Sequence, residues 1–305
     1  MPASVDPPNE IRPEPGRLGP EQRRADLERM AAETFDVAVI GAGSTGTGAA
    51  LDAASRGLSV ALVEARDFAS GTSSRSSKLI HGGLRYLEQQ EFGLVREALR
   101  ERGLLLNVIA PHLVRPVPFL YPLTEHWERP YVGAGMALYD GLGGHKGLPR
   151  HRHLTKRAAL KLAPALKRDC LVGGIQYYDA QVDDARHTLA LARTAAKYGA
   201  AVASNAPVVG FLREGERVTG VKVRDLVSGD EIEVRSRQVV NATGVWTDDV
   251  QSLVGERGKF KVRASKGVHL VVPRDRLQLE TGLIIKTEKS VLFVIPWGRH
   301  WIVGT

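Results

Sequence analysis

The chain has 305 residues, which exceeds the usual size of one hydrophobic core and predicts two packed units. Apolar residues make up 43% and charged residues 25% of the sequence, as in ordinary globular proteins, and no apolar run is long enough to span a membrane. The net charge of +8 favours anionic partners, but the basic residues are scattered among acids, so we expect no nucleic-acid binding. Cys170 is the single cysteine, so it predicts neither an internal disulfide nor a metal cluster.

The first 33 residues are predicted to be a separate N-terminal extension. Six prolines in residues 1–20 favour an extended stretch, and residues 20–32 then form a short amphipathic helix with Leu27 and Met30 on one side. We expect this helix to pack on the protein rather than to anchor it in a membrane. The segment has neither a secretory apolar stretch nor the acid-free composition of a transit peptide, so a cytoplasmic location is expected.

A strand–helix–strand unit follows the extension. Residues 36–40 and 58–63 are continuous apolar stretches that predict buried strands, and residues 44–56 between them predict a helix that ends at Gly57. Apolar strands on both sides of a helix are typical of a parallel sheet that is covered on both faces. The pattern therefore predicts the α/β class.

The turn between the first strand and the helix carries a dinucleotide fingerprint. Gly41, Gly43 and Gly46 match G-x-G-x-x-G, in which they allow the tight turn, the approach of a pyrophosphate, and close packing of helix on strand. Ser44 and Thr45 open the helix, whose first N–H groups would bind the phosphates. Glu64 follows the second strand and would accept hydrogen bonds from the ribose hydroxyls, which disfavours NADP.

The fingerprint alone does not distinguish FAD from NAD, but three further features favour FAD. Residues 70–78 are rich in small hydrogen-bonding side chains that could wrap a long cofactor, although a flexible linker has a similar composition. Alternating stretches at 207–212, 218–225 and 231–235 predict a small antiparallel meander. Residues 238–244 predict a strand that ends in the Ala242-Thr243-Gly244 turn, where backbone can approach a ligand closely.

The remaining elements extend the pattern over two interleaved domains. Helices are predicted over 91–110 and 183–198, and strands over 268–272 and 291–303, whereas residues 111–122 contain four prolines and are expected to leave the regular sheet. The fold class is therefore a Rossmann-type FAD-binding domain with a parallel sheet and an antiparallel meander, plus an interleaved α+β substrate domain. The expected boundaries are 1–33 for the extension, 34–115 and 176–250 for the FAD-binding domain, and 116–175 and 251–305 for the substrate domain. The chain stops in an apolar strand, from which we expect a truncated C-terminus.

Several stretches resemble one known family. They are Gly41 to Gly48, Glu64, and residues 73–88 (SSRSSKLIHGGLRYLE), 111–122, 177–187, 239–246, 265–273 and 293–297. The chain closely resembles the FAD-dependent glycerol-3-phosphate dehydrogenases, which belong to the superfamily of D-amino-acid-oxidase-like flavoproteins. The resemblance covers almost all residues from Phe35 to Thr305, and SSKLIHGGLRYLE is its most specific part.

The resemblance implies oxidation of sn-glycerol 3-phosphate to dihydroxyacetone phosphate, with electrons passing through FAD to a quinone at the membrane. Arg85 and Tyr86 would face the substrate, and His269 would sit near the reacting hydroxyl. Histidine suits the removal of a hydroxyl proton near neutral pH, and a guanidinium such as Arg85 can bind phosphate oxygens in pairs. The remaining flavin contacts implied by the resemblance are Ser73, Ser74, Ser76, Ser77, Lys78, Leu79, His81, Gly82, Val208, Ala242, Thr243 and Gly244.

Alternative functions remain open at this point. Another flavin oxidase of the same superfamily would share the glycine fingerprint but lacks the SSKLIHGGLRYLE stretch. The family also runs beyond residue 305, so an inactive FAD-binding fragment is a further alternative. The quinone acceptor and the basic charge predict a peripheral contact with the inner face of the membrane. The oligomeric state stays open.

Overall fold

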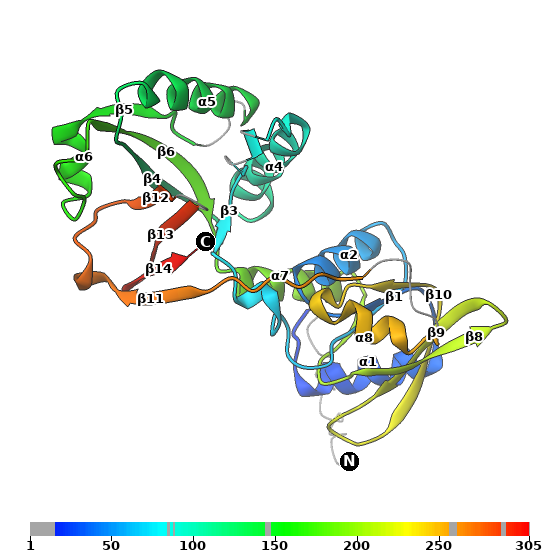
Figure 1. Cartoon of the computed structure of the whole chain (residues 1–305). Coiled ribbons are helices and arrows are strands. Elements are labelled where there is room, and N and C mark those ends of the chain that lie inside the picture. The colour runs from blue at the N-terminus through cyan, green and yellow to red at the C-terminus, as the bar shows by residue number, and fades with distance from the viewer. Residues whose placement is uncertain are drawn as a thin grey trace, which may run out of the picture. The chain divides into compact units, whose positions relative to one another are not determined.

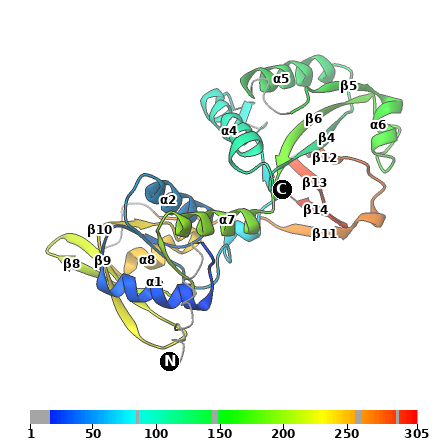
Figure 2. The same cartoon turned by 180° about the vertical axis from the view of Figure 1, so that it is seen from behind.

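The computed structural model describes residues 16–83, 86–87, 89–143, 148–255, 261–287 and 291–304. The described chain divides into two compact units (Figures 1 and 2). Unit 1 consists of the chain up to Arg75 together with Asp184–Ala264, and unit 2 of Ser76–Asp183 together with the chain from Ser265. Each unit is therefore built from two separate segments, and the fold is of the mixed α/β class that the sequence predicts.

Unit 1 is centred on a six-stranded sheet with the strand order β7-β2-β1-β10-β9-β8. The four strands from β7 to β10 are parallel, and β8, β9 and β10 form an antiparallel meander. Its helices and strands are α1 (Pro20–Ala32), β1 (Thr34–Ile40), α2 (Ser44–Ser55), β2 (Val60–Val63), η1 (Thr72–Ser74), α7 (Asp184–Lys197), β7 (Ala201–Ala203), β8 (Val208–Glu214), β9 (Arg217–Arg224), β10 (Glu231–Asn241), η3 (Gly244–Trp246) and α8 (Thr247–Ser252).

The two faces of this sheet bury different partners. Val60 and Leu62 of β2 pack with α2 and α7, while Ala61 and Val63 pack on the opposite face with Leu27 and Met30 of α1. This alternation follows from the two-residue period of a strand. It explains why the apolar run of β2 is continuous, and it confirms the covered parallel sheet.

One long strand replaces two that were predicted separately. Residues 231–235 and 238–241 are parts of β10, which pairs with β9 over Glu231–Arg235 and with β1 over Arg235–Asn241. The first half of β10 therefore belongs to the meander and the second half to the parallel sheet, and the two ladders meet at Arg235. As a result, the meander continues directly from the strand whose end carries the Ala242 turn.

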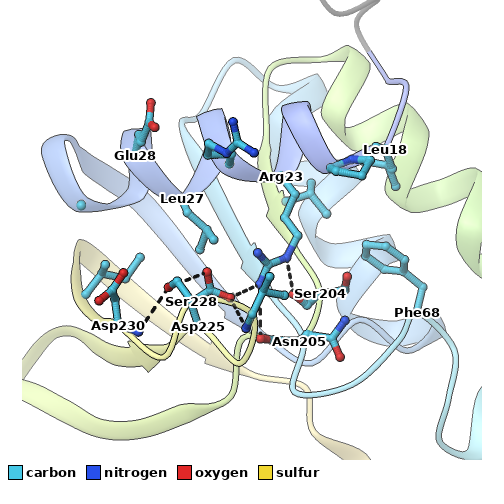
Figure 3. A pocket seen from close by; sticks show the side chains of 17 residues that line it. Leu18, Arg23, Leu27, Glu28, Phe68, Ser204, Asn205, Asp225, Ser228 and Asp230 are labelled. Atoms are coloured by element: carbon cyan, nitrogen blue, oxygen red, sulfur yellow. Dashed lines mark hydrogen bonds and ion pairs between the residues drawn. The ribbon is translucent and has the colours of Figure 1, made fainter.

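The helix α1 is fixed to unit 1 by polar contacts at its inner face. The buried carboxylate of Asp26 accepts a hydrogen bond from the N–H of Val202 in β7. Arg23 donates to the carbonyl oxygens of Ser204 and Asn205 and forms an ion pair with Asp225 at 2.5 Å (Figure 3). The predicted helix is thus part of the unit 1 fold.

A cavity of about 910 Å³ lies beside α1 in unit 1 (Figure 3). Its apolar walls include Leu27, Phe68 and Ile232, and the paired Arg23 and Asp225 also line it. None of the site residues predicted from the sequence lines this cavity. We therefore treat it as a consequence of how α1 packs, not as the candidate site.

Unit 2 is centred on an eight-stranded sheet in which β11-β14-β13-β12-β4-β6-β3 form one path and β5 also pairs with β6. One face packs against α5 and the other against α6 and the segments around Leu171 and Leu279. Its helices and strands are β3 (Leu79–Ile80), α4 (Phe92–Leu104), the π-helix η2 (Leu105–Ile109), β4 (Arg115–Leu123), α5 (Glu128–Gly143), β5 (Arg152–Thr155), α6 (Lys156–Leu162), β6 (Gly173–Gln181), β11 (His269–Pro273), η4 (Arg274–Arg276), β12 (Gly282–Lys286), β13 (Val291–Trp297) and β14 (His300–Gly304).

The proline-rich segment was expected to leave the sheet, and this prediction is wrong. Residues Arg115–Leu123 form β4, which pairs antiparallel with β6 along its whole length. Pro116, Pro118 and Pro122 are spaced by even numbers, so their missing N–H groups all face away from β6. The Pro118 carbonyl accepts from the Thr281 hydroxyl on that side, where pairing with β12 is short. Period-two prolines therefore leave the β4–β6 ladder intact.

The division into units also differs from the boundaries expected from the sequence. Residues 76–115 and 176–183 lie in unit 2, because β3 and β4 are hydrogen-bonded to β6. The described residues 251–255 and 261–264 stay with unit 1, which also contains α8. Among the described residues, no helix has the length and apolar character required to cross a membrane.

Candidate functional site

The glycine turn after β1 is held by backbone bonds to its neighbours in unit 1. Gly41 has a φ of +97°, a conformation that side chains disfavour, and its N–H donates to the Val63 carbonyl at 2.8 Å. A Cβ on Gly41 would lie 2.8 Å from the Ala242 carbonyl oxygen. The turn after β1 and the turn after β10 are therefore in direct contact.

Gly43 and Gly46 leave space that larger residues would fill. A Cβ on Gly46 would lie 1.8 Å from the Gly41 carbonyl oxygen, so α2 can approach β1 only with glycine at this position. Gly43 is the N-cap of α2 and makes no side-chain capping bond, and Thr45 is exposed in the first turn. The start of α2 thus offers backbone N–H groups and the positive end of a helix dipole, which fits a pyrophosphate.

Ser73 contacts the start of α2. Its hydroxyl oxygen accepts a hydrogen bond from the Ser44 N–H at 2.8 Å and lies 3.2 Å from where a Gly43 Cβ would be. Ser74 donates to the Gly71 carbonyl at 3.3 Å and belongs to the same short helix η1. The serine-rich segment therefore begins beside the predicted phosphate position, as the FAD interpretation requires.

Glu64 lies at the end of β2, beside the glycine turn. Its carboxylate accepts hydrogen bonds from the Ala42 N–H at 2.7 Å and from the Arg66 N–H at 2.9 Å. Each carboxylate oxygen can accept about two hydrogen bonds, so lone pairs remain for ribose hydroxyls. This geometry fits an adenosine diphosphate group, with the ribose at Glu64 and the phosphates at α2.

The Ala242-Thr243-Gly244 turn is shaped by its preceding residue. The Asn241 amide oxygen accepts from the Thr243 N–H at 3.2 Å and from the Thr243 hydroxyl at 2.6 Å, which is an Asx-turn. Gly244 then has a φ of +59°. Asn241 was not among the predicted site residues, although an asparagine before a Thr-Gly turn is a recognisable signal.

Two further residues of this region were not predicted from the sequence. The Arg66 guanidinium lies over the Trp246 ring, 5.0 Å from its centroid. A Cβ on Gly71 would lie 3.0 Å from the same ring. No local motif marks a contact between residues 66 and 246, because it depends on the pairing of β10 with β1.

Val208 is placed differently from the other predicted cofactor residues. It begins β8, two residues after Ala206, whose N–H donates to the Glu64 carbonyl at 2.8 Å. Its side chain packs against the core that contains Phe35. Val208 thus lies two residues after a backbone hydrogen bond to Glu64, while its side chain contributes to the interior.

The remaining predicted cofactor residues of the serine-rich segment lie in unit 2. Lys78 has a φ of +62°, and its ammonium nitrogen lies 5.8 Å from the centroid of the Trp297 ring. Its N–H donates to the Ser76 hydroxyl at 2.9 Å, and Ser77 is half-buried between the two. Leu79 pairs with Gln181 across β3 and β6. These contacts fix the backbone that leads into the next turn.

That turn contains two glycines in different surroundings. His81 is exposed, and its Nδ1 accepts from the Gly83 N–H at 3.0 Å. Gly82 is buried, and its N–H donates to the Tyr139 hydroxyl at 2.8 Å. Tyr86 follows, and its N–H donates to the Gly83 carbonyl at 2.7 Å. The turn therefore presents the His81 side chain while its backbone is anchored inward.

The predicted catalytic residues are placed only in part. Arg85 lies outside the described residues. Tyr86 is half-buried against Leu99 and Tyr139, whereas His269 opens β11 and pairs across the sheet with Gly304. A Cβ on Gly304 would lie 2.2 Å from Cδ2 of His269, so the imidazole occupies the space beside this glycine. Tyr86 and His269 therefore have different surroundings, one beside α4 and α5 and the other on the β11–β14 pair.

Comparison with known proteins gives one family and several close relatives. A family model described as FAD dependent oxidoreductase, named DAO, matches residues 36–305. Glycerol-3-phosphate dehydrogenase of Mycobacterium leprae is 64% identical over 289 residues, which are 94% of this chain and 49% of that protein. Glycerol-3-phosphate dehydrogenase 2 of Mycobacterium tuberculosis is 65% identical, with the same coverage.

A solved structure extends the comparison to the fold. The glycerol-3-phosphate dehydrogenase of Bacillus halodurans, complexed with FAD, superposes with a TM-score of 0.70 at 29% identity and covers 93% of this chain and 49% of that one. The chain thus spans about half the length of the curated relatives it matches.

Proposed function

The chain belongs to the FAD dependent oxidoreductase family, whose model matches residues 36–305, and we propose that it takes part in the FAD-dependent oxidation of sn-glycerol 3-phosphate to dihydroxyacetone phosphate. This proposal rests on the 64–65% sequence identity to glycerol-3-phosphate dehydrogenases over 94% of the chain. Solved relatives named as glycine oxidase or L-amino acid deaminase are 16–23% identical, which supports only a shared fold.

In this proposal, unit 1 binds the adenosine diphosphate half of FAD. Because Gly41, Gly43 and Gly46 have no side chains, the cofactor can approach the protein backbone closely, and the start of α2 attracts its phosphates. Glu64 accepts hydrogen bonds from the ribose. The contacts of Ser73 with Ser44 and of Gly41 with Ala242 support this assignment, because they gather the predicted residues around one turn.

Unit 2 contributes the residues assigned to the flavin ring and the substrate. Bound FAD would supply the acceptor for the hydride that leaves the alcohol carbon. His269 accepts the hydroxyl proton, and Gly304 leaves room for its ring to lie over β14. Tyr86 and Arg85 are proposed to orient the substrate, with the Arg85 guanidinium binding its phosphate.

The electron acceptor and the location are part of the same proposal. We assign electron transfer to a quinone, with a peripheral contact at the inner face of the membrane in the cytoplasm. The net charge of +8 supports a contact with anionic lipids. A fraction of protein that sediments with anionic vesicles and falls as the salt concentration is raised would support this contact. A fraction that does not change with salt concentration would contradict it.

The central experiment is an anaerobic absorption spectrum of the purified chain with FAD, before and after addition of glycerol 3-phosphate. A flavin spectrum that bleaches would support the proposed reaction. A flavin spectrum that bleaches with an amino acid instead would favour another oxidase of the superfamily. Failure to bind flavin would contradict the cofactor proposal for this chain.

The variant His269→Gln separates proton transfer from cofactor binding. We expect it to retain the flavin spectrum but to bleach at least 100-fold more slowly, in line with the contribution of a general base. The exposed His300 of β14 offers a matched control, because His300→Gln removes an imidazole from the neighbouring strand. Equal bleaching rates in the two variants would contradict the assigned role of His269.

A further inference from the structure

The turn of residues His81–Gly83 is anchored from inside unit 2. The buried Gly82 N–H donates to the Tyr139 hydroxyl, which comes from α5. A Cβ on Gly82 would lie 2.3 Å from Cδ2 of Leu99 in α4, so only glycine fits between these helices. The position of the turn is therefore defined by side chains of α4 and α5.

A buried ion pair fixes the Tyr139 hydroxyl in turn. This hydroxyl donates to Oδ1 of Asp179 at 2.8 Å, and Arg102 donates to the same oxygen at 2.5 Å. Arg102 also donates to the Tyr139 oxygen at 3.3 Å. Because the hydroxyl proton is committed to Asp179, the lone pairs of the oxygen face Gly82 and Arg102. The network runs from a charge pair to one backbone amide.

All three side chains of this network are almost completely buried. Their exposed fractions are 7% for Arg102, 1% for Tyr139 and 3% for Asp179. Burial raises the pKa of Asp179 from its ordinary value, an effect that Arg102 and then His81 oppose electrostatically. Burial likewise raises the pKa of the Tyr139 hydroxyl well above its usual value, so it remains a donor.

Stability alone does not account for this arrangement. Replacing a buried ion pair by apolar residues of similar volume is often neutral or stabilising, because the desolvation of two charges offsets much of their attraction. The apolar cluster of Val95, Leu99 and Tyr139 already packs α4 against α5. The distinctive result of the charged network is a defined position for the Gly82 amide.

We propose that Arg102, Asp179 and Tyr139 form a positioning network that sets where the His81–Gly83 turn stands relative to the bound flavin. This inference rests on the proposed function, in which the turn contacts the flavin ring. None of the three residues would touch the cofactor themselves. They act through the Gly82 amide, and they come from α4, β6 and α5, so that three separate elements determine one turn.

The variant Tyr139→Phe tests the network, because it keeps the ring and removes the hydroxyl. The matched control is Tyr131→Phe, which removes a hydroxyl from an exposed position of the same helix. We expect hydrogen exchange in the peptide 79–87 to rise at least 10-fold in Tyr139→Phe, while peptides of β6 keep their rates. We also expect a shifted flavin absorption band and FAD affinity about 10-fold weaker, with the affinity for ADP unchanged.

Several outcomes would overturn the inference. Unchanged exchange in peptide 79–87 would mean that Tyr139 does not anchor the turn. Faster exchange with an unchanged flavin band and FAD affinity would reduce the network to a structural role. Failure of the wild-type chain to bind FAD would be seen before any variant is made, and it would overturn the proposed function together with this inference.

A second variant covers the case in which Tyr139→Phe does not fold, which would appear as faster exchange throughout unit 2. The double variant Arg102→Met/Asp179→Asn removes both charges together and leaves no lone buried ion. It is expected to raise exchange in peptide 79–87 and to shift the flavin band, as above. Wild-type values for both measurements would overturn the inference.

Discussion

The contrast between Gly46 and Gly48 gives the sharpest test of the glycine turn. Both residues lie in α2, and both become alanine in the test. A Cβ at Gly46 would lie 1.8 Å from the Gly41 carbonyl oxygen, whereas ordinary contact begins near 3.4 Å. A Cβ at Gly48 would meet no atom within 4 Å. The two substitutions should therefore have opposite effects on the free energy of unfolding.

The magnitudes follow from the two environments. In Gly46→Ala the clash is with backbone, so α2 must move away from β1, and such overpacking costs about 3 kcal/mol. The higher helix propensity of alanine stabilises α2 by up to about 1 kcal/mol, so the free energy of unfolding should fall by about 2 kcal/mol in total. Gly48→Ala gains the propensity without the clash and should be about 0.5–1 kcal/mol more stable than the wild type.

Urea unfolding followed by circular dichroism would measure both values, and a flavin fluorescence titration would measure FAD affinity. Displacement of α2 moves the N–H groups at its start, so we expect FAD affinity to fall on the order of 30-fold in Gly46→Ala, equivalent to about 2 kcal/mol. Gly48→Ala should bind FAD as the wild type does. Equal stabilities within about 0.5 kcal/mol would refute the packing argument.

Two further predictions concern charged groups of unit 1. Arg23 lowers the pKa of Asp225 to about 2, so the ion pair stabilises the fold above about pH 4 and is lost as the pH falls towards 2. Arg23→Ala should therefore lower the free energy of unfolding by about 1–2 kcal/mol at neutral pH, allowing for solvent screening, and should flatten its dependence on pH between 4 and 2. The control Arg24→Ala, at an exposed neighbouring position, should change neither the free energy of unfolding nor its pH dependence. An unaltered acid profile in urea titrations of Arg23→Ala would contradict this. Glu64→Gln should weaken FAD binding about 10-fold with little effect on FMN binding, because hydrogen bonds to a charged group contribute about 1.5–3 kcal/mol. The control is Glu214→Gln, which changes an exposed carboxylate of β8. Equal losses for FAD and FMN would count against a ribose contact.

Local patterns predicted most of unit 1. The helices α1, α2 and α7 lie within one residue of their predicted ends, because Gly57 and Gly199 stop two of them with φ values of +85° and +93°. The glycine fingerprint predicted the turn after β1, since each position requires glycine because of its own backbone conformation or the close approach of neighbouring backbone. Such reasons are visible in a sequence because they involve neighbours along the chain.

Long-range pairing was the part that local patterns could not supply. The strand β4 was missed because proline usually signals the end of a ladder, and only the pairing with β6 reveals which edge the prolines face. The Arg66–Trp246 contact and the Arg102–Asp179 pair join residues that are far apart in sequence. Charge and aromatic character did not single these residues out, since both are common on surfaces.

The central position of β10 in its sheet also affects how the chain folds during translation. Translation completes β1 at Ile40, but β10 begins only at Glu231. At about 5–20 residues per second, the nascent β1 waits on the order of 10–40 s for its partner. During that time one apolar edge remains open to aggregation or to a chaperone, and folding requires a contact between distant parts of the chain. An N-terminal stretch that contains the whole sheet must therefore run past Asn241 and include Ser76–Asp183 of unit 2, whereas a version reduced to unit 1 needs a linker that joins Arg75 to Asp184.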